Sequence, residues 1–188
     1  GLSFKQVKGE ETLRRAAEAA GWGQPKPNPL IGRGIAIYDR KTGGGQGNGA
    51  IIVNPDGTAT LLSSTFDQGS GTPTILRQIV AEELTLPLED IQIVTLDTDS
   101  GPFDGGVGGS RVTHMAGQAI LKASENIRDT LIGLAAKLLD CQKDSVHLQN
   151  THFFSDGNTT RQIPIREVVK EGIKLFGKIE AKITYIPE

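Results

Sequence analysis

Residues 66–84 read FDQGSGTPTILRQIVAEEL, a glycine-rich loop that leads directly into an amphipathic segment. Leu76, Val80 and Leu84 recur every four residues, which is the spacing of one face of a helix. The sequence therefore predicts a helix over 72–84 whose first residues follow the glycines without an intervening linker.

A second glycine-rich loop, residues 104–113, reads DGGVGGSRVT and stands before the longest apolar pattern of the chain. From Val112 to Leu138 apolar residues recur every three or four positions, which predicts a helix over 111–139. At about 1.5 Å per residue this helix would be roughly 40 Å long. Each glycine loop is thus expected to open onto a helix.

The remaining patterns predict short helices and strands around this long helix. Asn54-Pro-Asp-Gly57 and Asp156-Gly157 are turn sequences between β-prone runs and indicate two hairpins. The other predicted elements are helices over 10–20, where Gly21 can take the left-handed cap, and 165–175, and strands over 34–39, 91–96 and 178–186. The fold class is predicted as α+β (mixed α/β), with antiparallel hairpins and strands packed on one long helix and several shorter helices.

Glycine and proline mark the connections. The proline-rich run 24–29 reads as an irregular linker, and the glycine cluster 43–49 is interpreted as a loose, flexible loop. We therefore divide the chain into an N-terminal helix with its linker, 1–29, and a domain portion over 30–188. The 188 residues suffice for one substantial domain.

Composition excludes several classes of function. The net charge is −2 and basic residues are scattered, so no nucleic-acid-binding surface is expected. No apolar stretch is long enough for a membrane span, and we expect a cytoplasmic protein. One cysteine, Cys141, can neither form a disulfide within the chain nor ligate an iron–sulfur cluster. The histidines lack zinc-type spacing, and Asp97 and Asp99 are predicted to form a strand-end turn, so no metal ligand is assigned.

The glycine loops have two physical interpretations. Glycine allows close approach of the backbone, and the first N–H groups of a helix lack internal partners, so each loop is suited to bind phosphate or another anion. Thr72, Thr74, Ser110 and Thr113 could add hydroxyl donors, and Arg111 a charge. The structural alternative is that Ser110 is an ordinary N-cap and that Gly69 and Gly71 form a tight turn. The residues alone leave these two interpretations about equally supported.

A resemblance to a known family favours the first interpretation. Residues 69–84 follow the pattern GxGTxTxxxQIxAEEL, residues 97–99 read DTD, and residues 109–119 follow GSRxTxxxGxA. In this order and spacing the chain resembles the molybdenum hydroxylases of the xanthine dehydrogenase and aldehyde oxidase family, most clearly from about residue 53 to residue 123. In that family the two loops hold the molybdopterin.

The resemblance implies which positions contact the cofactor. They are Gln68, Gly69, Ser70, Gly71, Thr72 and Thr74 in the first loop and Gly109, Ser110, Arg111 and Thr113 in the second. Many family members have Gly-Gln-Gly where this chain has Gly69-Ser70-Gly71, so a contact from a glutamine side chain is not implied. The implied cofactor is molybdopterin, in its plain or cytosine dinucleotide form.

The same resemblance implies a role in a larger enzyme. Such enzymes oxidise purines, other N-heterocycles or aldehydes with water as the oxygen source. The glutamate that serves the family as general base has no counterpart here, so no catalytic residue is assigned. Iron–sulfur and FAD groups are expected on other domains or subunits, which would be partners together with the remaining molybdenum-subunit domains. The chain is thus expected to be an excerpt, inactive when isolated.

Two other classes of function remain as alternatives. A non-redox phosphate or anion binder could use the same two helix starts, although no Gly-Lys-Ser/Thr phosphate motif is present. An assembly domain could use the long helix or an exposed apolar face to contact a partner.

Overall fold

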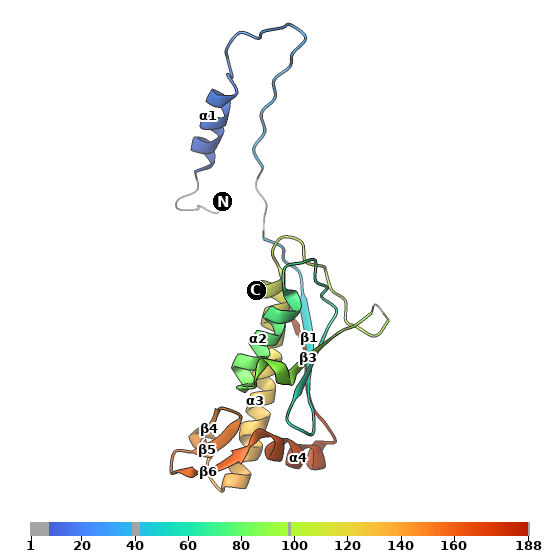
Figure 1. The fold of residues 1–188 in the computed structure, drawn as a ribbon, viewed down its shortest axis with the longest axis vertical. Helices are drawn as coiled ribbons and strands as arrows, with labels where there is room; N and C mark the ends of the chain where they lie inside the picture. The colour runs from blue at the N-terminus through green and yellow to red at the C-terminus, as the bar shows by residue number, and fades with distance from the viewer. Residues whose placement is uncertain (1–7, 39–41, 98, 188) are drawn as a thin grey trace. The chain divides into compact units, whose positions relative to one another are not determined.

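The computed structural model describes residues 8–38, 42–97 and 99–187 and separates into two units, Gly1–Lys41 and Thr42–Glu188. Within the first unit, α1 spans Gly9–Ala19, and Gly21 follows it with a φ of +62°, so the predicted helix and its left-handed glycine are confirmed. Arg33 returns toward this helix end, where its guanidinium donates to the carbonyl groups of Gly21 and Gln24 at 2.7 and 2.8 Å. Figure 1 shows the elements of both units in chain order.

The strand predicted over 34–39 is wrong for residues 34–38. They have no regular structure, and Asp39 lies outside the described residues. An apolar run becomes a strand only when a neighbouring strand satisfies its backbone hydrogen bonds. Among the described residues none pairs with this run, and Ile37 is 62% exposed.

The second unit is built on a four-stranded sheet with the order β3-β2-β1-β7. Its strands are β1 (Gly47–Val53), β2 (Ala59–Ser63), β3 (Ile91–Thr95) and β7 (Ile179–Tyr185). β1 is antiparallel to β2 and to β7, whereas β2 and β3 are parallel. The first predicted hairpin is confirmed, and Gly57 in its turn has a φ of +94°. The prediction of a mixed α+β fold is confirmed as well.

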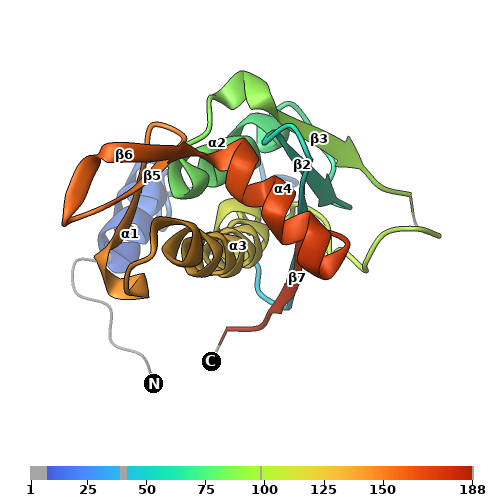
Figure 2. The same ribbon diagram turned by 90° about the horizontal axis from the view of Figure 1, so that it is seen from below.

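Two helices cover one face of this sheet (Figures 1 and 2). They are α2 (Thr72–Leu84), which matches its prediction, and α3 (Gly117–Leu139). The long helix was predicted from residue 111, but Val112–Ala116 forms a wider π-helical turn before α3. The N–H of Gly117 donates to the carbonyl of Val112, five residues earlier, which is the hydrogen bond of such a turn.

A smaller sheet and a last helix lie at the C-terminal end of α3. The sheet has the order β4-β5-β6, with β4 (Val146–Gln149), β5 (His152–Ser155) and β6 (Asn158–Pro164). β5 and β6 are the second predicted hairpin, whereas β4 was not predicted. α4 spans Ile165–Phe176 and β7 follows it, both close to their predicted bounds. No described helix is long and apolar enough to cross a bilayer.

The core forms where α3 faces the sheet. Ile127 and Leu131 of α3, Ile51 of β1, Leu61 of β2 and Leu76 of α2 are each at most 1% exposed and belong to one cluster. Burying one such side chain contributes about 1.5–3 kcal/mol, so α3 is held mainly by this apolar face. The same cluster continues along α3 to Phe153 of β5, which links the two sheets.

The interpretation of residues 43–49 as a flexible loop is wrong in its second half. Residues 47–49 belong to β1 and are buried. A Cβ on Gly47 would lie 2.1 Å from the carbonyl oxygen of Met115, and one on Gly49 would lie 2.1 Å from Cδ1 of Ile120. These glycines therefore let the strand approach the start of the long helix, a close contact that composition cannot distinguish from a linker.

We predict that Gly47→Ala lowers the free energy of unfolding by about 1–3 kcal/mol, because its Cβ would overlap a backbone carbonyl that cannot rotate away. Gly133→Ala is the matched control. Gly133 lies within α3, and a Cβ there meets nothing within 4 Å. Alanine favours the helix, so this variant should gain about 0.5–1 kcal/mol. Urea unfolding followed by circular dichroism measures both values, and a Gly47→Ala protein as stable as the wild type would contradict the packing.

Candidate functional site: two glycine loops at one end of the sheet

The two glycine loops leave the sheet at the same end. β2 and β3 are parallel neighbours, paired from Ala59 with Ile91 to Ser63 with Thr95, so their carboxyl ends lie side by side. The hydroxyl of Thr65, just after β2, donates to Oδ2 of Asp104 at 2.8 Å. That hydrogen bond joins the base of the first loop to the beginning of the second, although 39 residues separate them.

The helices that follow the loops also begin at this end. A Cβ on Gly117 of α3 would lie 3.2 Å from Cδ1 of Ile79 in α2, and farther along Arg128 of α3 forms an ion pair with Glu83 of α2. Residue numbers thus rise together along the two helices, which means that they run parallel. The N-terminal, partially positive ends of both helix dipoles therefore face the loops.

The predicted site residues differ in how accessible they are. Thr72 is 2% exposed and Arg111 is 6% exposed, while Gly71 and Gly109 are half-buried. The exposed members are Gln68, Gly69, Ser70, Thr74, Ser110 and Thr113. The loops therefore offer mainly backbone groups and small hydroxyl side chains to a ligand.

An aspartate that sequence reasoning missed organises the first loop. Oδ1 of Asp67 accepts hydrogen bonds from three consecutive backbone N–H groups, those of Gly69, Ser70 and Gly71, at 2.9, 2.9 and 3.2 Å. Gly69 and Gly71 have φ values of +98° and +78°, which let these N–H groups converge on one point. An aspartate two residues before a glycine turn was the available signal.

The carboxylate of Asp67 is stabilised in its charged form. Desolvation raises the pKa of Asp67, but hydrogen bonds from the backbone N–H groups of residues 69–72 lower it by more, so the net pKa lies below its ordinary value. The loop thus stabilises negative charge on an oxygen that its N–H groups surround.

The structural alternatives raised by the sequence are partly correct. Gly69 and Gly71 do form a tight turn, and Gly71 is the N-cap residue of α2 without a side-chain cap. Ser110, however, is not the N-cap residue: that position belongs to Arg111, and Ser110 precedes it with a φ of +58°. An ordinary serine cap therefore does not account for the second loop.

The second loop is fixed from the inside by Arg111. Its guanidinium donates through Nε to the carbonyl of Gly44 at 3.0 Å, through Nη1 to that of Gly106 at 2.8 Å, and through Nη2 to that of Gln46. Asp104, the nearest carboxylate, lies 3.9 Å from Nη1. The charge predicted to face a ligand thus points into the protein.

A groove begins beside the second loop and follows the line between α2 and α3. It encloses about 400 Å³, and its apolar lining includes Ile75, Ile79 and Leu121. Thr113 of the second loop lines it, as do the polar side chains of Gln78 and Gln118. The site therefore continues into an apolar surface between the two helices.

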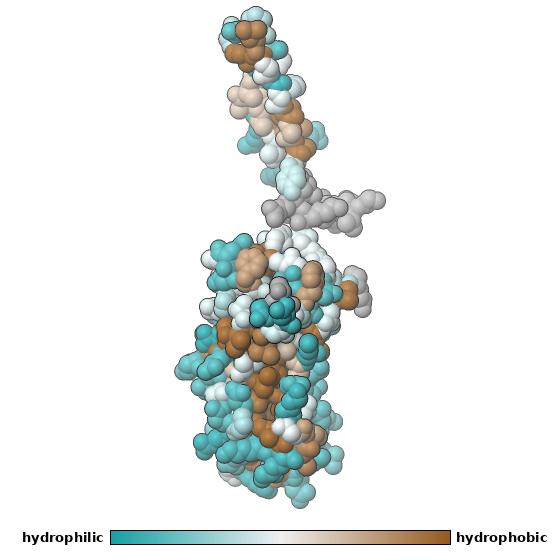
Figure 3. Space-filling view, turned by 90° about the vertical axis from the view of Figure 1, so that its right-hand side faces the viewer, coloured by the Kyte–Doolittle hydropathy of each residue, from teal (hydrophilic) through white to brown (hydrophobic). Residues whose placement is uncertain are grey.

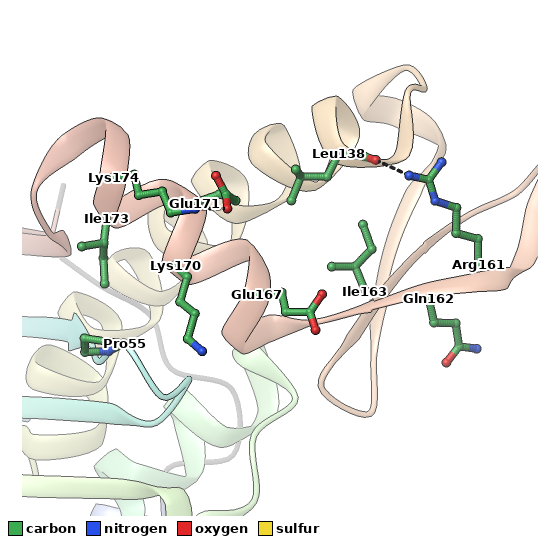
Figure 4. A pocket seen from close by; sticks show the side chains of 10 residues that line it. All are labelled: Pro55, Leu138, Arg161, Gln162, Ile163, Glu167, Lys170, Glu171, Ile173 and Lys174. Carbon is green, nitrogen blue, oxygen red and sulfur yellow. Dashed lines mark hydrogen bonds and ion pairs between the residues drawn. The ribbon is translucent and has the colours of Figure 1, made fainter.

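A larger hollow lies elsewhere and does not belong to the site. It encloses about 710 Å³ and is lined by β6, α4 and Leu138 near the end of α3 (Figure 4). Leu138 and Thr113 are separated by most of the long helix, on the order of 35 Å at 1.5 Å per residue. Charged side chains such as Arg161, Lys170 and Glu171 surround this hollow.

Within the part of the chain that the structure describes, no cluster of three or more His, Cys, Asp or Glu side chains could hold a metal ion. Asp97 and Asp99 form the predicted turn, because Oδ1 of Asp97 accepts from the N–H groups of Asp99 and Ser100. The first loop is characterised by the backbone donors around Asp67.

Comparison with known proteins agrees with this chemistry. A protein family described as molybdopterin cofactor-binding domain matches residues 6–187. The probable hypoxanthine oxidase XdhD of Escherichia coli (strain K12) is 36% identical over 136 residues, which cover 69% of this chain and 14% of that protein. The carbon monoxide dehydrogenase large chain of Hydrogenophaga pseudoflava is 30% identical over 159 residues, covering 78% of this chain and 20% of that protein.

Solved structures share the fold. Carbon monoxide dehydrogenase from Oligotropha carboxidovorans matches with a TM-score of 0.69 and 28% identity over 74% of this chain and 18% of that chain. Quinoline 2-oxidoreductase from Pseudomonas putida 86 matches in fold with a TM-score of 0.68 over 76% of this chain and 19% of that chain. The chain thus spans no more than about a fifth of these relatives. The matches favour the cofactor-binding interpretation over an unrelated phosphate binder or assembly domain.

We predict that Asp67→Asn increases the affinity of the first loop for inorganic pyrophosphate, because a neutral amide competes less well than a carboxylate for the same N–H groups. Asp144→Asn, which removes an equal charge from an exposed residue outside the two loops, should leave affinity unchanged. Isothermal titration calorimetry measures both. Unchanged or weaker binding by Asp67→Asn would contradict this competition between Asp67 and the ligand.

The turn should also respond to pH in one direction. Since the folded pKa of Asp67 is lowered, its stabilisation of the turn is complete above the ordinary value of 3.8 and is lost as the pH falls through the folded pKa. An NMR titration of the carboxyl carbon should therefore give a midpoint below 3.8.

Proposed function

The chain belongs to the molybdopterin cofactor-binding domain family, and from that premise we propose that its two glycine loops hold the pterin and phosphate groups of the cofactor in a molybdenum hydroxylase. The whole protein would oxidise purines, other N-heterocycles or aldehydes, with water as the source of oxygen. This chain would supply part of the binding site for the cofactor.

The observation that carries this proposal is the arrangement of donors around Asp67. Three consecutive N–H groups converge on one anionic oxygen at the start of a helix, and a hydrogen bond joins that loop to the second one. A phosphate oxygen, like the Asp67 oxygen, is negatively charged and accepts hydrogen bonds, so it could replace that oxygen at these N–H groups. The residues present therefore suit the anionic part of a molybdopterin.

We assign the binding contacts to the loop positions that the family resemblance implies. Backbone N–H groups would hold the phosphate, and the hydroxyls of Ser70, Thr74, Ser110 and Thr113 would orient the ligand. Arg111 would contribute through its backbone, because its side chain is committed to carbonyl groups inside the protein. The full set is Gln68, Gly69, Ser70, Gly71, Thr72, Thr74, Gly109, Ser110, Arg111 and Thr113. When bound, the cofactor would supply the two-electron redox centre.

We propose the other components by analogy with the relatives. Their names describe a large chain, a large subunit and a complex subunit gamma, which indicates multisubunit complexes. Iron–sulfur and FAD groups would lie on other domains or subunits, and the cofactor would be plain molybdopterin or the cytosine dinucleotide form. Residues 1–29 would lead into a binding-domain portion over 30–188, in a cytoplasmic enzyme.

The open face of the main sheet supports contact with further domains of such an enzyme. Ile51 and Leu61 point toward the helices, so Ile52 and Leu62 point to the opposite face, where Leu62 pairs with Val94. Val94 is 43% exposed. Seen from the sheet side, hydrophobic surface runs along this unit (Figure 3). Extended apolar surface of this kind marks an interface.

We predict that the full-length protein contains molybdenum and pterin and hydroxylates at least one compound among hypoxanthine, N-heterocycles and aldehydes. In ¹⁸O-labelled water the new oxygen of the product should carry the label, as mass spectrometry can show. The 188-residue chain alone should have no such activity, because it carries no assigned general base. If the isolated chain hydroxylated any of these compounds, the proposal that it binds the cofactor but lacks the catalytic base would be refuted.

We also predict that Gly69→Ala and Gly71→Ala each lower the cofactor content of the full-length protein about 5- to 30-fold. Both glycines have positive φ, and an L side chain there costs about 1–2 kcal/mol in the bound geometry. Gly157→Ala, in the turn between β5 and β6 with nothing within 4 Å of the added Cβ, is the control. Molybdenum analysis measures the cofactor content. If both loop variants kept the wild-type content, the first loop would be excluded as a binding site for the cofactor.

A further inference from the structure

The side chain of Arg111 lies inside the protein and not on the surface of the glycine loops. The residue is 6% exposed, and all three of its guanidinium nitrogens donate to carbonyl oxygens, those of Gly44, Gly106 and Gln46. Two of these acceptors belong to the segment before β1 and one belongs to the second loop. The planar guanidinium thus holds together two segments that are more than 60 residues apart.

The two segments are in direct backbone contact around this side chain. The N–H of Gly43 donates to the carbonyl of Gly109 at 2.7 Å. A Cβ on Gly43 would lie 2.4 Å from the carbonyl oxygen of Gly108, and one on Gly105 would lie 2.7 Å from Nη1 of Arg111. The glycines therefore leave room for the guanidinium and for the opposing backbone: a Cβ on Gly43 would overlap a backbone carbonyl, and one on Gly105 would displace the guanidinium.

The nearest carboxylate connects this cluster to the first loop. Asp104 lies 3.9 Å from Nη1 of Arg111, accepts from the N–H of Gly106 at 2.7 Å and accepts from the hydroxyl of Thr65 at 2.8 Å. A displacement of the guanidinium would therefore disturb the second loop directly and the first loop through Asp104.

We propose that Arg111 is a positioning residue, whose guanidinium clamps residues 43–46 to residues 105–109 and so aims the backbone donors of the second loop at the ligand. This inference rests on the proposed function, because it concerns the same site. It differs from direct recognition, in which the positive charge of Arg111 would contact a phosphate. In the clamp the charge matters less than the forked shape, which reaches three carbonyl groups at once.

The two roles make opposite predictions for lysine. A lysine keeps the charge but has a single donor head, so it cannot reach all three carbonyls. If Arg111 is a clamp, Arg111→Lys should bind inorganic pyrophosphate about as poorly as Arg111→Ala, with affinity reduced about 10- to 100-fold by the misplaced donors. The salt dependence of binding should be unchanged in both, because no charge that faces the ligand is lost.

A glycine variant tests the clamp without changing any charge. Gly43→Ala should lose a similar amount of pyrophosphate affinity, because its Cβ would push against the carbonyl of Gly108. The adjacent Gly44→Ala is the matched control, since a Cβ there meets nothing within 4 Å and the carbonyl that accepts from Arg111 remains. Arg161→Ala controls for net charge, because it removes an exposed arginine of β6 that lies near the C-terminal end of α3.

The experiment uses the cofactor-free full-length protein, titrated with pyrophosphate at several salt concentrations, together with amide hydrogen exchange over residues 43–47 and 105–111. The clamp predicts weaker binding and faster exchange in Arg111→Lys and Gly43→Ala, and neither change in the two controls. Wild-type affinity in Arg111→Lys, or a reduced salt dependence in Arg111→Ala, would overturn it. If the wild type binds neither pyrophosphate nor cofactor, the proposed function fails. The clamp is tested separately by amide hydrogen exchange, and unchanged exchange rates in Arg111→Lys and Gly43→Ala would overturn it.

Discussion

The parallel pairing of β2 with β3 is the constraint on which the site depends. Parallel neighbours need a crossover connection, here α2, and their carboxyl ends necessarily meet at one edge of the sheet. The loops that follow these strands, and the helices that follow the loops, are therefore brought together by topology, although they are far apart in sequence. Ligand sites in sheets with parallel strands commonly form outside those carboxyl ends for this reason.

This arrangement has an electrostatic cost that an anion relieves. α2 and α3 run parallel and in contact, so their positive N-terminal ends lie near each other. Nearby carboxylates reduce this repulsion. Asp67 accepts from the N–H groups before α2, and Asp104 accepts from the N–H of Gly106 in the loop before α3. A phosphate bound between the two starts would act in the same way. The parallel packing that brings two positive helix ends together thus also favours an anion at this place.

The sequence predicted regular elements well where the pattern is local. The helix over 72–84 and the first hairpin needed only the periodicity of apolar residues and a turn signal. The prediction failed where a distant contact decides the structure. Gly47 and Gly49 look like linker residues, yet they are buried because Met115 and Ile120 approach them closely. The run 34–38 has the composition of a strand but no strand pairs with it among the described residues.

The candidate site shows the same division between local and distant information. The two loops and their helix starts could be found from glycine spacing and family resemblance. The direction of the Arg111 side chain could not, because its acceptors are carbonyl groups, which every residue carries and no sequence pattern marks. Two of them belong to the cluster that composition assigned to a linker.

A charged residue beside an anion site is therefore weak evidence for direct contact with the anion. The backbone can supply the donors while the cation is used to hold that backbone in place. In this chain the exposed residues around the two helix starts are mostly glycines and polar residues, whereas the arginine is buried. Binding would then depend on how rigidly the loops are held, which makes the contact between residues 43–46 and the second loop as important as any group that touches the ligand.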